Sequence, residues 1–227
     1  KKDMTARGWA TQFQQRPAPA EGDRFKREYW NVVRFDPVAV LEKANDKCWS
    51  WDCAFKDLDD SSYVVGLAVA RVGADFYVLH VTRAHMGYAA TKTAVRTCAA
   101  KWPQVHKKLI EDKANGTAVI EELKSAIGGI EPVEPEGGKE SRAAILEPYH
   151  EGRNFYLLEG APWVEDFIEE FATFPNGEHD DQVDALSQAF AWLHKRWQKQ
   201  SGAWTTSASK STASWHHEEP YNDPRYS

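Results

Sequence analysis

Residues 63–83, YVVGLAVARVGADFYVLHVTR, decide the fold class of this sequence. Two runs rich in β-branched and aromatic residues, 63–72 and 76–83, flank the turn residues GAD at 73–75, a pattern that predicts an antiparallel β-hairpin. A similar run, KCWSWDCAFK at 47–56, precedes the hairpin across a polar DLDDSS segment. We therefore expect three sequential antiparallel strands.

The rest of the chain alternates between helical and strand patterns. The stretch DDQVDALSQAFAWLHKRWQK at 180–199 repeats apolar residues every three or four positions and is the strongest predicted helix. Further helices are expected over 88–102, 117–127, 140–152 and 162–171, with strands at 107–112 and 154–159 and a short one near Ile130. This order predicts an α/β sheet with helices on its faces.

The composition excludes several classes of protein. Of the 227 residues, 42% are hydrophobic, 12% are aromatic and ten are Trp, which is too apolar for a disordered chain. No run approaches about eighteen apolar residues, so no membrane span is expected, and the N-terminus carries no apolar signal segment. The three Cys, at positions 48, 53 and 98, lack metal-ligand spacing and are expected as reduced, buried thiols. No phosphate-binding GxxxxGK[ST] loop occurs, which argues against nucleotide hydrolysis.

The net charge of −6 would argue against a bulk electrostatic DNA binder, but the charge is unevenly distributed. Residues 83–113 contain seven basic and two acidic residues, whereas residues 114–190 contain four basic and seventeen acidic ones. Part of the acidic excess lies in HDDQVD at 179–184. The acidic total therefore does not by itself exclude DNA as a partner.

Acidic residues occur at three places that could converge. Asp52 lies in mid-strand between aromatic residues, where a carboxylate needs a cation or hydrogen-bond donors to remain ionised; a surface or turn-capping Asp is the alternative. Glu111 and Asp112 end the predicted strand 107–112. Because adjacent strand residues face opposite sides, only one of these two can join a shared site. Alternatively, both are simply solvated.

The third acidic place is HDDQVD at 179–184, which opens the last predicted helix. Asp181 and Asp184 are three residues apart and share one helical face. Capping and the helix dipole also explain Asp180 or Asp181, but they explain Asp184 less well because it lies beside the apolar stripe. Hard cations take oxygen ligands, and a pair of them about 3.5–4 Å apart activates water for phosphodiester cleavage. The sequence offers no convincing His/Cys set, which argues against zinc.

The order of these motifs resembles a known family. Asp52 in a strand before a hairpin, IEDKANG at 110–116 and HDDQVDALSQAF at 179–190 are similar to the C-terminal nuclease domain of bacteriophage large terminase subunits. The segment WATQFQQRPAPAEGDRFKREYW at 9–30 is similar to the linker that follows the ATPase domain in that family. The resemblance spans residues 9–193. It implies an α/β, RNase H-like (RuvC-like) fold, in which a central mixed sheet has three antiparallel strands followed by parallel strands and helices on both faces.

The resemblance also implies roles for individual residues. Carboxylates that hold two Mg²⁺ or Mn²⁺ ions are implied at four positions: Asp52, Glu111, Asp181 and Asp184. Asp180 would assist them, and Asp112 is the alternative to Glu111. Basic residues that would contact the DNA backbone are Lys113, Lys139 and Arg142, although all three could be ordinary solvated surface.

The activity implied by the resemblance is a metal-dependent endodeoxyribonuclease that cuts concatemeric, double-stranded viral DNA in the host-cell cytoplasm. Its partners would be the small terminase subunit, the portal protein and the ATPase domain of the same polypeptide. Residues 1–46 would be the linker from that ATPase domain, 47–200 the nuclease domain and 201–227 a disordered, Ser/Thr-rich tail. Alternatives are a stand-alone RNase H-like nuclease or junction resolvase, and a non-catalytic module that docks on the portal or small terminase. Because the sequence contains no Walker motif, this chain could cut DNA but not translocate it.

Overall fold

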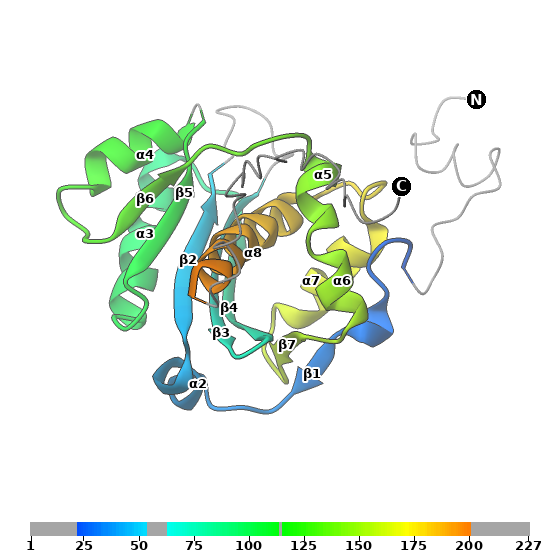
Figure 1. The fold of residues 1–227 in the computed structure, drawn as a ribbon. Helices are drawn as coiled ribbons and strands as arrows, with labels where there is room; N and C mark the ends of the chain where they lie inside the picture. Colours follow the sequence, from blue (N-terminus) through cyan, green and yellow to red (C-terminus); the bar gives the residue numbers. More distant parts are fainter. Residues whose placement is uncertain (1–21, 54–62, 114, 201–227) are drawn as a thin grey trace, which may run out of the picture.

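A seven-stranded mixed sheet lies at the centre of the molecule (Figure 1). The computed structural model describes residues 22–53, 63–113 and 115–200; the tail predicted at 201–227 and the first 21 residues of the predicted linker lie outside the described residues. The strand order is β1-β7-β4-β3-β2-β5-β6. The strands are β1 (Asn31–Val33), β2 (Asp46–Asp52), β3 (Val64–Val72), β4 (Asp75–Ala84), β5 (Lys107–Glu111), β6 (Ile130–Val133) and β7 (Phe155–Leu158).

The three predicted antiparallel strands are confirmed as β2, β3 and β4. β3 pairs antiparallel with both of its neighbours, whereas the other described pairings are parallel. Gly73 forms the β3–β4 turn with a φ of +63°, a left-handed conformation that glycine adopts without strain. Gly66 in β3 lies against Trp51, and a Cβ at this glycine would be 2.4 Å from the indole ring. The hairpin that opened the sequence argument thus sets the centre of the sheet.

Helices cover both faces of the sheet, as the sequence predicted. The helices on one face are α5 (Lys139–Ala144), α6 (Glu147–Glu151), α7 (Val164–Thr173) and α8 (Asp181–Gln200), together with the short 3₁₀ helix η1 (Arg27–Tyr29). Those on the other face are α2 (Pro37–Lys43), α3 (Tyr88–Lys101) and α4 (Asn115–Leu123). β2 divides its side chains between the two cores, with Cys48 on the α8 side and Trp49 and Trp51 on the α3 side. This alternation accounts for the Trp-rich strand.

Two further predictions concern the cysteines and the helix expected over 140–152. The three cysteines are buried free thiols, as expected. The helix predicted over 140–152 is divided into α5 and α6, and Pro148 lies in the first turn of the second helix. Proline has no amide hydrogen and its ring is tolerated only at the start of a helix, so a new helix begins here. None of the described helices is long and apolar enough to cross a membrane.

Part of the predicted linker belongs to the folded body. β1 pairs in parallel with β7, which extends the sheet by one edge strand. Phe25 and Trp30 are buried, and His150 Nε2 lies 3.0 Å from the carbonyl oxygen of Lys26. The predicted boundary between residues 46 and 47 falls inside β2. A three-residue strand has too little periodicity to be recognised in the sequence, and only its pairing with β7 defines it.

Candidate metal centre

The ends of β2 and β5 bring Asp52 and Glu111 to the same edge of the sheet. The two strands are parallel neighbours with Trp51 paired to Ile110, and Asp52 and Glu111 are the next residue of each strand. Side chains alternate along a strand, so Glu111 shares the face of Leu109, which belongs to the core beneath α8. Glu111 thus faces the same helix as Asp52 does.

α8 runs antiparallel to β2 across that face. Gln188 Nε2 donates a hydrogen bond to Ser50 Oγ at 2.9 Å, and the C-terminal half of α8 bonds to the start of β2. Asp184 lies one helical turn before Gln188, and Asp52 lies two residues after Ser50 on the same face. The first turn of α8 therefore lies over the end of β2 that carries Asp52.

The acidic residues of β2 and α8 are nearly inaccessible to solvent. Asp52 and Asp181 are each 7% exposed, and Asp184 is 8% exposed. Asp181 Oδ2 accepts a hydrogen bond from the Tyr63 amide at 3.4 Å. Burial, assisted by the neighbouring charge of Asp180, raises the pKa of Asp181 above its usual value. A negative charge here is costly unless a cation approaches.

Two of the predicted DNA-binding residues, Lys139 and Arg142 of α5, contact this acidic group. Arg142 Nη2 donates to Asp184 Oδ1 at 2.7 Å. Lys139 Nζ lies 2.6 Å from Asp180 Oδ1 and 3.4 Å from Asp184 Oδ2. The structure thus brings the basic residues of α5 to the carboxylates at the start of α8.

Glu111 and Asp112 face different surroundings. Glu111 Oε1 lies 3.4 Å from Nζ of Lys113, the third predicted DNA-binding residue, which is exposed. Asp112 Oδ1 accepts from the Thr117 hydroxyl at 2.6 Å, and the Asp112 amide donates to the Val133 carbonyl at 2.8 Å. The carboxylate of Asp112 is therefore directed to α4, whereas Glu111 lies on the face of the sheet beneath α8.

The donor chemistry of this region fits a hard cation, because it consists of carboxylate oxygens at the ends of two strands and one helix. The raised pKa of Asp181 is consistent with a place for positive charge. Within the described residues, no three Asp, Glu, His or Cys side chains come together closely enough to form a metal-holding group. The elements converge, while Asp180 and Asp184 are bonded to Lys139 and Arg142.

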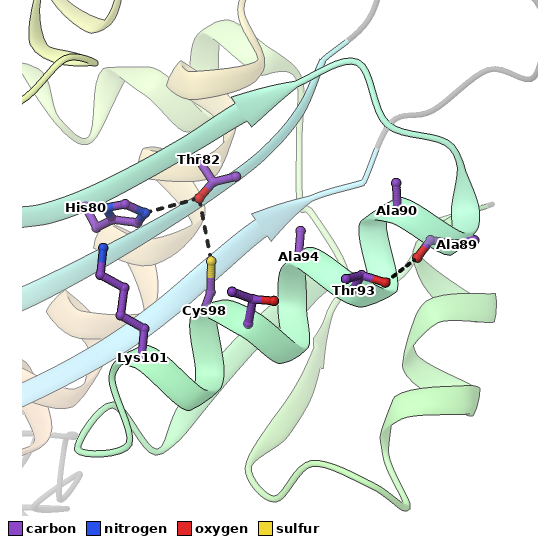
Figure 2. Close-up of a pocket in the computed structure, with 9 residues that line it drawn as sticks. His80, Thr82, Ala89, Ala90, Thr93, Ala94, Cys98 and Lys101 are labelled. Carbon is purple, nitrogen blue, oxygen red and sulfur yellow. Dashed lines mark hydrogen bonds between the residues drawn. The ribbon is translucent and has the colours of Figure 1, made fainter.

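A surface hollow of about 620 Å³ lies on the opposite face of the sheet, between β4 and α3 (Figure 2). Figure 2 shows the Thr82 hydroxyl between His80 and Cys98, 3.3 Å from the ring nitrogen and 3.5 Å from the thiol. Burial lowers the pKa of His80 to about 4, so its ring is neutral at pH 7. None of the predicted acidic residues lines this hollow.

The family of this fold is indicated by a direct comparison. The family model of the terminase RNase H-like domain matches residues 49–192, more than half of the chain. The chain belongs to this family. The matched span of this terminase domain contains all nine of the predicted site residues, from Asp52 to Asp184. Comparison with curated proteins finds no match.

Solved structures show the same fold. The large terminase nuclease of the thermophilic phage G20c with bound magnesium has a TM-score of 0.56 and 13% identity, over 76% of this chain and 98% of that one. The manganese-bound large terminase nuclease domain of bacteriophage SPP1 has a TM-score of 0.53 and 13% identity, over 74% and 99%. The manganese-soaked terminase nuclease domain of human cytomegalovirus has a TM-score of 0.52 and 12% identity, over 74% and 92%. These likenesses confirm the predicted RNase H-like architecture.

Sequence reasoning missed the residues that lie behind the start of α8. Glu170 in α7 is 5% exposed and bonds to Gln182, which is fully buried. A signal was available, because Glu170 falls on the apolar stripe of α7 that includes Phe167 and Phe171. A charged residue on a buried stripe requires a polar partner, but the sequence does not indicate which one.

Proposed function

We propose that this terminase domain is a metal-dependent endonuclease that cuts double-stranded viral DNA during genome packaging. One observation carries the proposal. The hydrogen bond from Gln188 to Ser50 fixes α8 on β2, and it thereby sets Asp184 over the end of β2 that carries Asp52. The family and the similar nuclease structures support the same function.

The residues that would hold the metal come from all three acidic places. We propose that two Mg²⁺ or Mn²⁺ ions are held by Asp52, Glu111, Asp181 and Asp184, with Asp180 assisting. When bound, such ions supply an activated water and stabilise the leaving oxygen of the phosphodiester. Glu111 is preferred to Asp112 because the Asp112 carboxylate is bonded to Thr117 of α4. Similar nuclease structures with bound magnesium, manganese, zinc and cobalt support a divalent ion, and the choice of Mg²⁺ or Mn²⁺ rests on the all-carboxylate ligand set.

The basic residues would act on the DNA. In the structure, Lys139 and Arg142 bond to Asp180 and Asp184, whose carboxylates would bind the ions. Metal binding would release these two side chains, and the phosphate backbone is the natural acceptor of a free guanidinium or ammonium group. Lys113 is exposed beside Glu111 and could contact the same strand of DNA. The chain would thus exchange one set of opposite charges for another on binding substrate.

The wider setting is also proposed from the family. The nuclease domain proposed at 47–200 would also include the edge strand β1 that precedes it, and the residues before this folded body would connect it to an ATPase domain of the same polypeptide. Concatemeric viral DNA would be the substrate, the small terminase subunit and the portal protein the partners, and the host-cell cytoplasm the place of action.

Cleavage of supercoiled plasmid with Mg²⁺ or Mn²⁺ tests the proposal. We expect Asp52→Asn to lower the cleavage rate at least about a thousandfold, because the loss of a metal-bridging charge removes several kcal/mol of transition-state stabilisation. Glu121→Gln on the exposed surface of α4 is the matched control and should cut at the parental rate. A parent that cuts with neither metal, or an Asp52→Asn variant that cuts like the parent, would contradict the proposal; the first result would favour a non-catalytic docking module.

A further inference from the structure

The first turn of α8 is held by a side chain from a different helix. Glu170 Oε1 of α7 accepts from the Gln182 amide at 2.5 Å, and Glu170 Oε2 accepts from Gln182 Nε2 at 2.6 Å. Gln182 lies between Asp181 and Asp184, the two α8 residues proposed as metal ligands. One buried carboxylate therefore binds both the backbone and the side chain of the residue between them.

This arrangement replaces ordinary helix capping. The amides of the first turn have no partner within the helix, and the side chain of the N-cap residue usually accepts one of them. Asp180 occupies the N-cap position of α8, since its carbonyl accepts from the Asp184 amide at 2.9 Å. Its carboxylate accepts from Lys139 instead, and Glu170 takes the Gln182 amide. The carboxylate of Asp180 therefore lies on the side of α8 that faces α5, where it binds Lys139.

Arg83 of β4 connects Glu170 to the surroundings of Asp181. Arg83 Nε lies 3.3 Å from Glu170 Oε2, and its guanidinium carbon lies 3.5 Å from the centre of the Tyr63 ring. The Tyr63 amide in turn donates to Asp181 Oδ2 at 3.4 Å. The same arginine thus contacts the carboxylate that caps α8 and the residue that binds the first aspartate of α8.

Burying the charges of this cluster costs free energy of folding. Burial raises the pKa of Glu170, and the bonds from Gln182 and the charge of Arg83 oppose that shift. The charge of Asp181 adds to the rise. A buried acid beside a second buried acid lowers stability unless it is fully bonded, and a cap supplied by Asp180 itself would avoid this cost. The effect of the cluster is to fix the position of the first turn of α8 through Gln182.

We propose that Glu170 is a positioning residue for the metal centre: by capping α8 from α7, it holds Asp181 and Asp184 where they present their carboxylates to the ions. The inference rests on the proposed function, because it takes these two aspartates as ligands. Glu170 itself contacts neither ion nor DNA in this scheme. Its effect passes through the backbone of Gln182.

Binding of Mn²⁺ to the complete chain without DNA, followed by electron paramagnetic resonance of the free ion, separates this role from catalysis. We expect Glu170→Ala to weaken Mn²⁺ binding about tenfold. We expect Glu170→Gln to restore most of the affinity, because the amide oxygen still accepts from the Gln182 backbone. Glu169→Ala is the matched control; Glu169 adjoins Glu170 but pairs with Arg27 on the exposed side of α7, so its loss should leave binding unchanged. Gln182→Ala, which removes only the side-chain donor, should weaken binding about threefold.

The results divide cleanly when Asp184→Asn is measured alongside. If Asp184→Asn loses Mn²⁺ but Glu170→Ala and Gln182→Ala, each folded by circular dichroism, bind like the parent, the positioning role is overturned and the metal centre stands. If Asp184→Asn and Asp52→Asn both bind like the parent, the proposed centre itself is overturned. If Glu170→Ala fails to fold, Gln182→Ala and Glu170→Gln decide the question, and a Glu170→Gln variant as weak as Asp184→Asn would overturn capping as the mechanism.

Discussion

The two ends of β2 each carry a buried aspartate beneath α8, but their surroundings differ. At the start of the strand, Asp46 accepts from Arg71 at 2.8 Å and from Arg196 at 2.6 Å. Burial acts to raise the pKa of Asp46, but the two guanidinium groups outweigh it and hold the pKa below its usual value. At the end of the strand, where Asp52 lies, burial raises the pKa of Asp181 instead.

The difference separates a structural ion cluster from a candidate binding site. Arg71 is 2% exposed and also donates to the Gly73 carbonyl, so the cation beside Asp46 is fixed in place. The cations near Asp184 come from α5, a helix of six residues, and Lys139 is more than half exposed. Separating a buried ion pair leaves a charge without compensation, so Asp46 and Arg71 stay together. Acids whose cations lie on a short, exposed helix can exchange those cations for metal ions.

The sharpest way to break this comparison uses Glu111 and Asp112. We expect Glu111→Gln to lower the rate of metal-dependent plasmid cleavage at least about a hundredfold, because it removes a ligand charge from the face beneath α8. Asp112→Asn, the matched neighbour, should keep the rate within about threefold, since its oxygen still accepts from Thr117. The reverse pattern, with Asp112→Asn inactive and Glu111→Gln active, would move the site to the other face of the sheet.

Asp46→Asn tests the structural end of the strand. Removing one partner of a buried ion pair leaves Arg71 and its charge uncompensated, so we expect the free energy of unfolding in urea to fall by about 3 kcal/mol. Plasmid cleavage at 20 °C by the folded fraction should stay within about twofold of the parent. Asp75→Asn, a partly exposed strand residue, is the control and should change the stability far less. A large loss of cleavage in folded Asp46→Asn would show that the two ends are coupled.

The pH dependence of the same variant sharpens the distinction. A carboxyl whose pKa is lower in the folded than in the unfolded chain contributes stability above its unfolded pKa of about 3.9, and loses it as the pH falls through the folded pKa. The stability difference between the parent and Asp46→Asn should therefore be full at pH 7 and narrow below about pH 4. A difference that is constant from pH 7 to pH 3 would show that Asp46 is not held ionised by its arginines.

The contrast also shows which parts of the molecule the sequence could predict. The β2–β4 meander, the long α8 and the acidic positions follow from local patterns, such as the alternation around Asp52 and the three- to four-residue steps of α8. The antiparallel placement of α8 on β2 does not, because it depends on the Gln188–Ser50 contact between residues 138 positions apart. The Glu170 cap joins residues only 12 positions apart, but they belong to two different helices and no local repeat pairs them. Local periodicity predicts individual helices and strands, whereas the contacts between these elements form only in the folded chain.

The smallest expected effect belongs to Arg142 of α5. It pairs with Asp184 near the start of α8, as Arg71 of β3 pairs with Asp46 near the end of α8. Its side chain is 15% exposed, against 3% for Arg71, and its partner is Asp184. We expect Arg142→Gln to lower the free energy of unfolding of the metal-free protein by about 1 kcal/mol, because Lys139 Nζ still lies 3.4 Å from Asp184 Oδ2 and compensates this buried carboxylate. Mn²⁺ affinity should rise about threefold, since Asp184 is no longer shared with a guanidinium group.

Urea unfolding of the metal-free variant measures the first value, and titration of the folded variant with Mn²⁺ measures the second. Arg96→Gln is the control, because Arg96 of α3 pairs loosely with Glu122 of α4, away from α8. A lower Mn²⁺ affinity in Arg142→Gln would mean that the guanidinium orders Asp184 for the ion instead of competing with it. Arg142 would then be a fixed partner like Arg71, and the exchange of basic side chains for metal would lose its support. A higher affinity together with weaker DNA binding would place Arg142 on the phosphate backbone once the ions are bound, because a freed guanidinium gains more from a phosphate than from water.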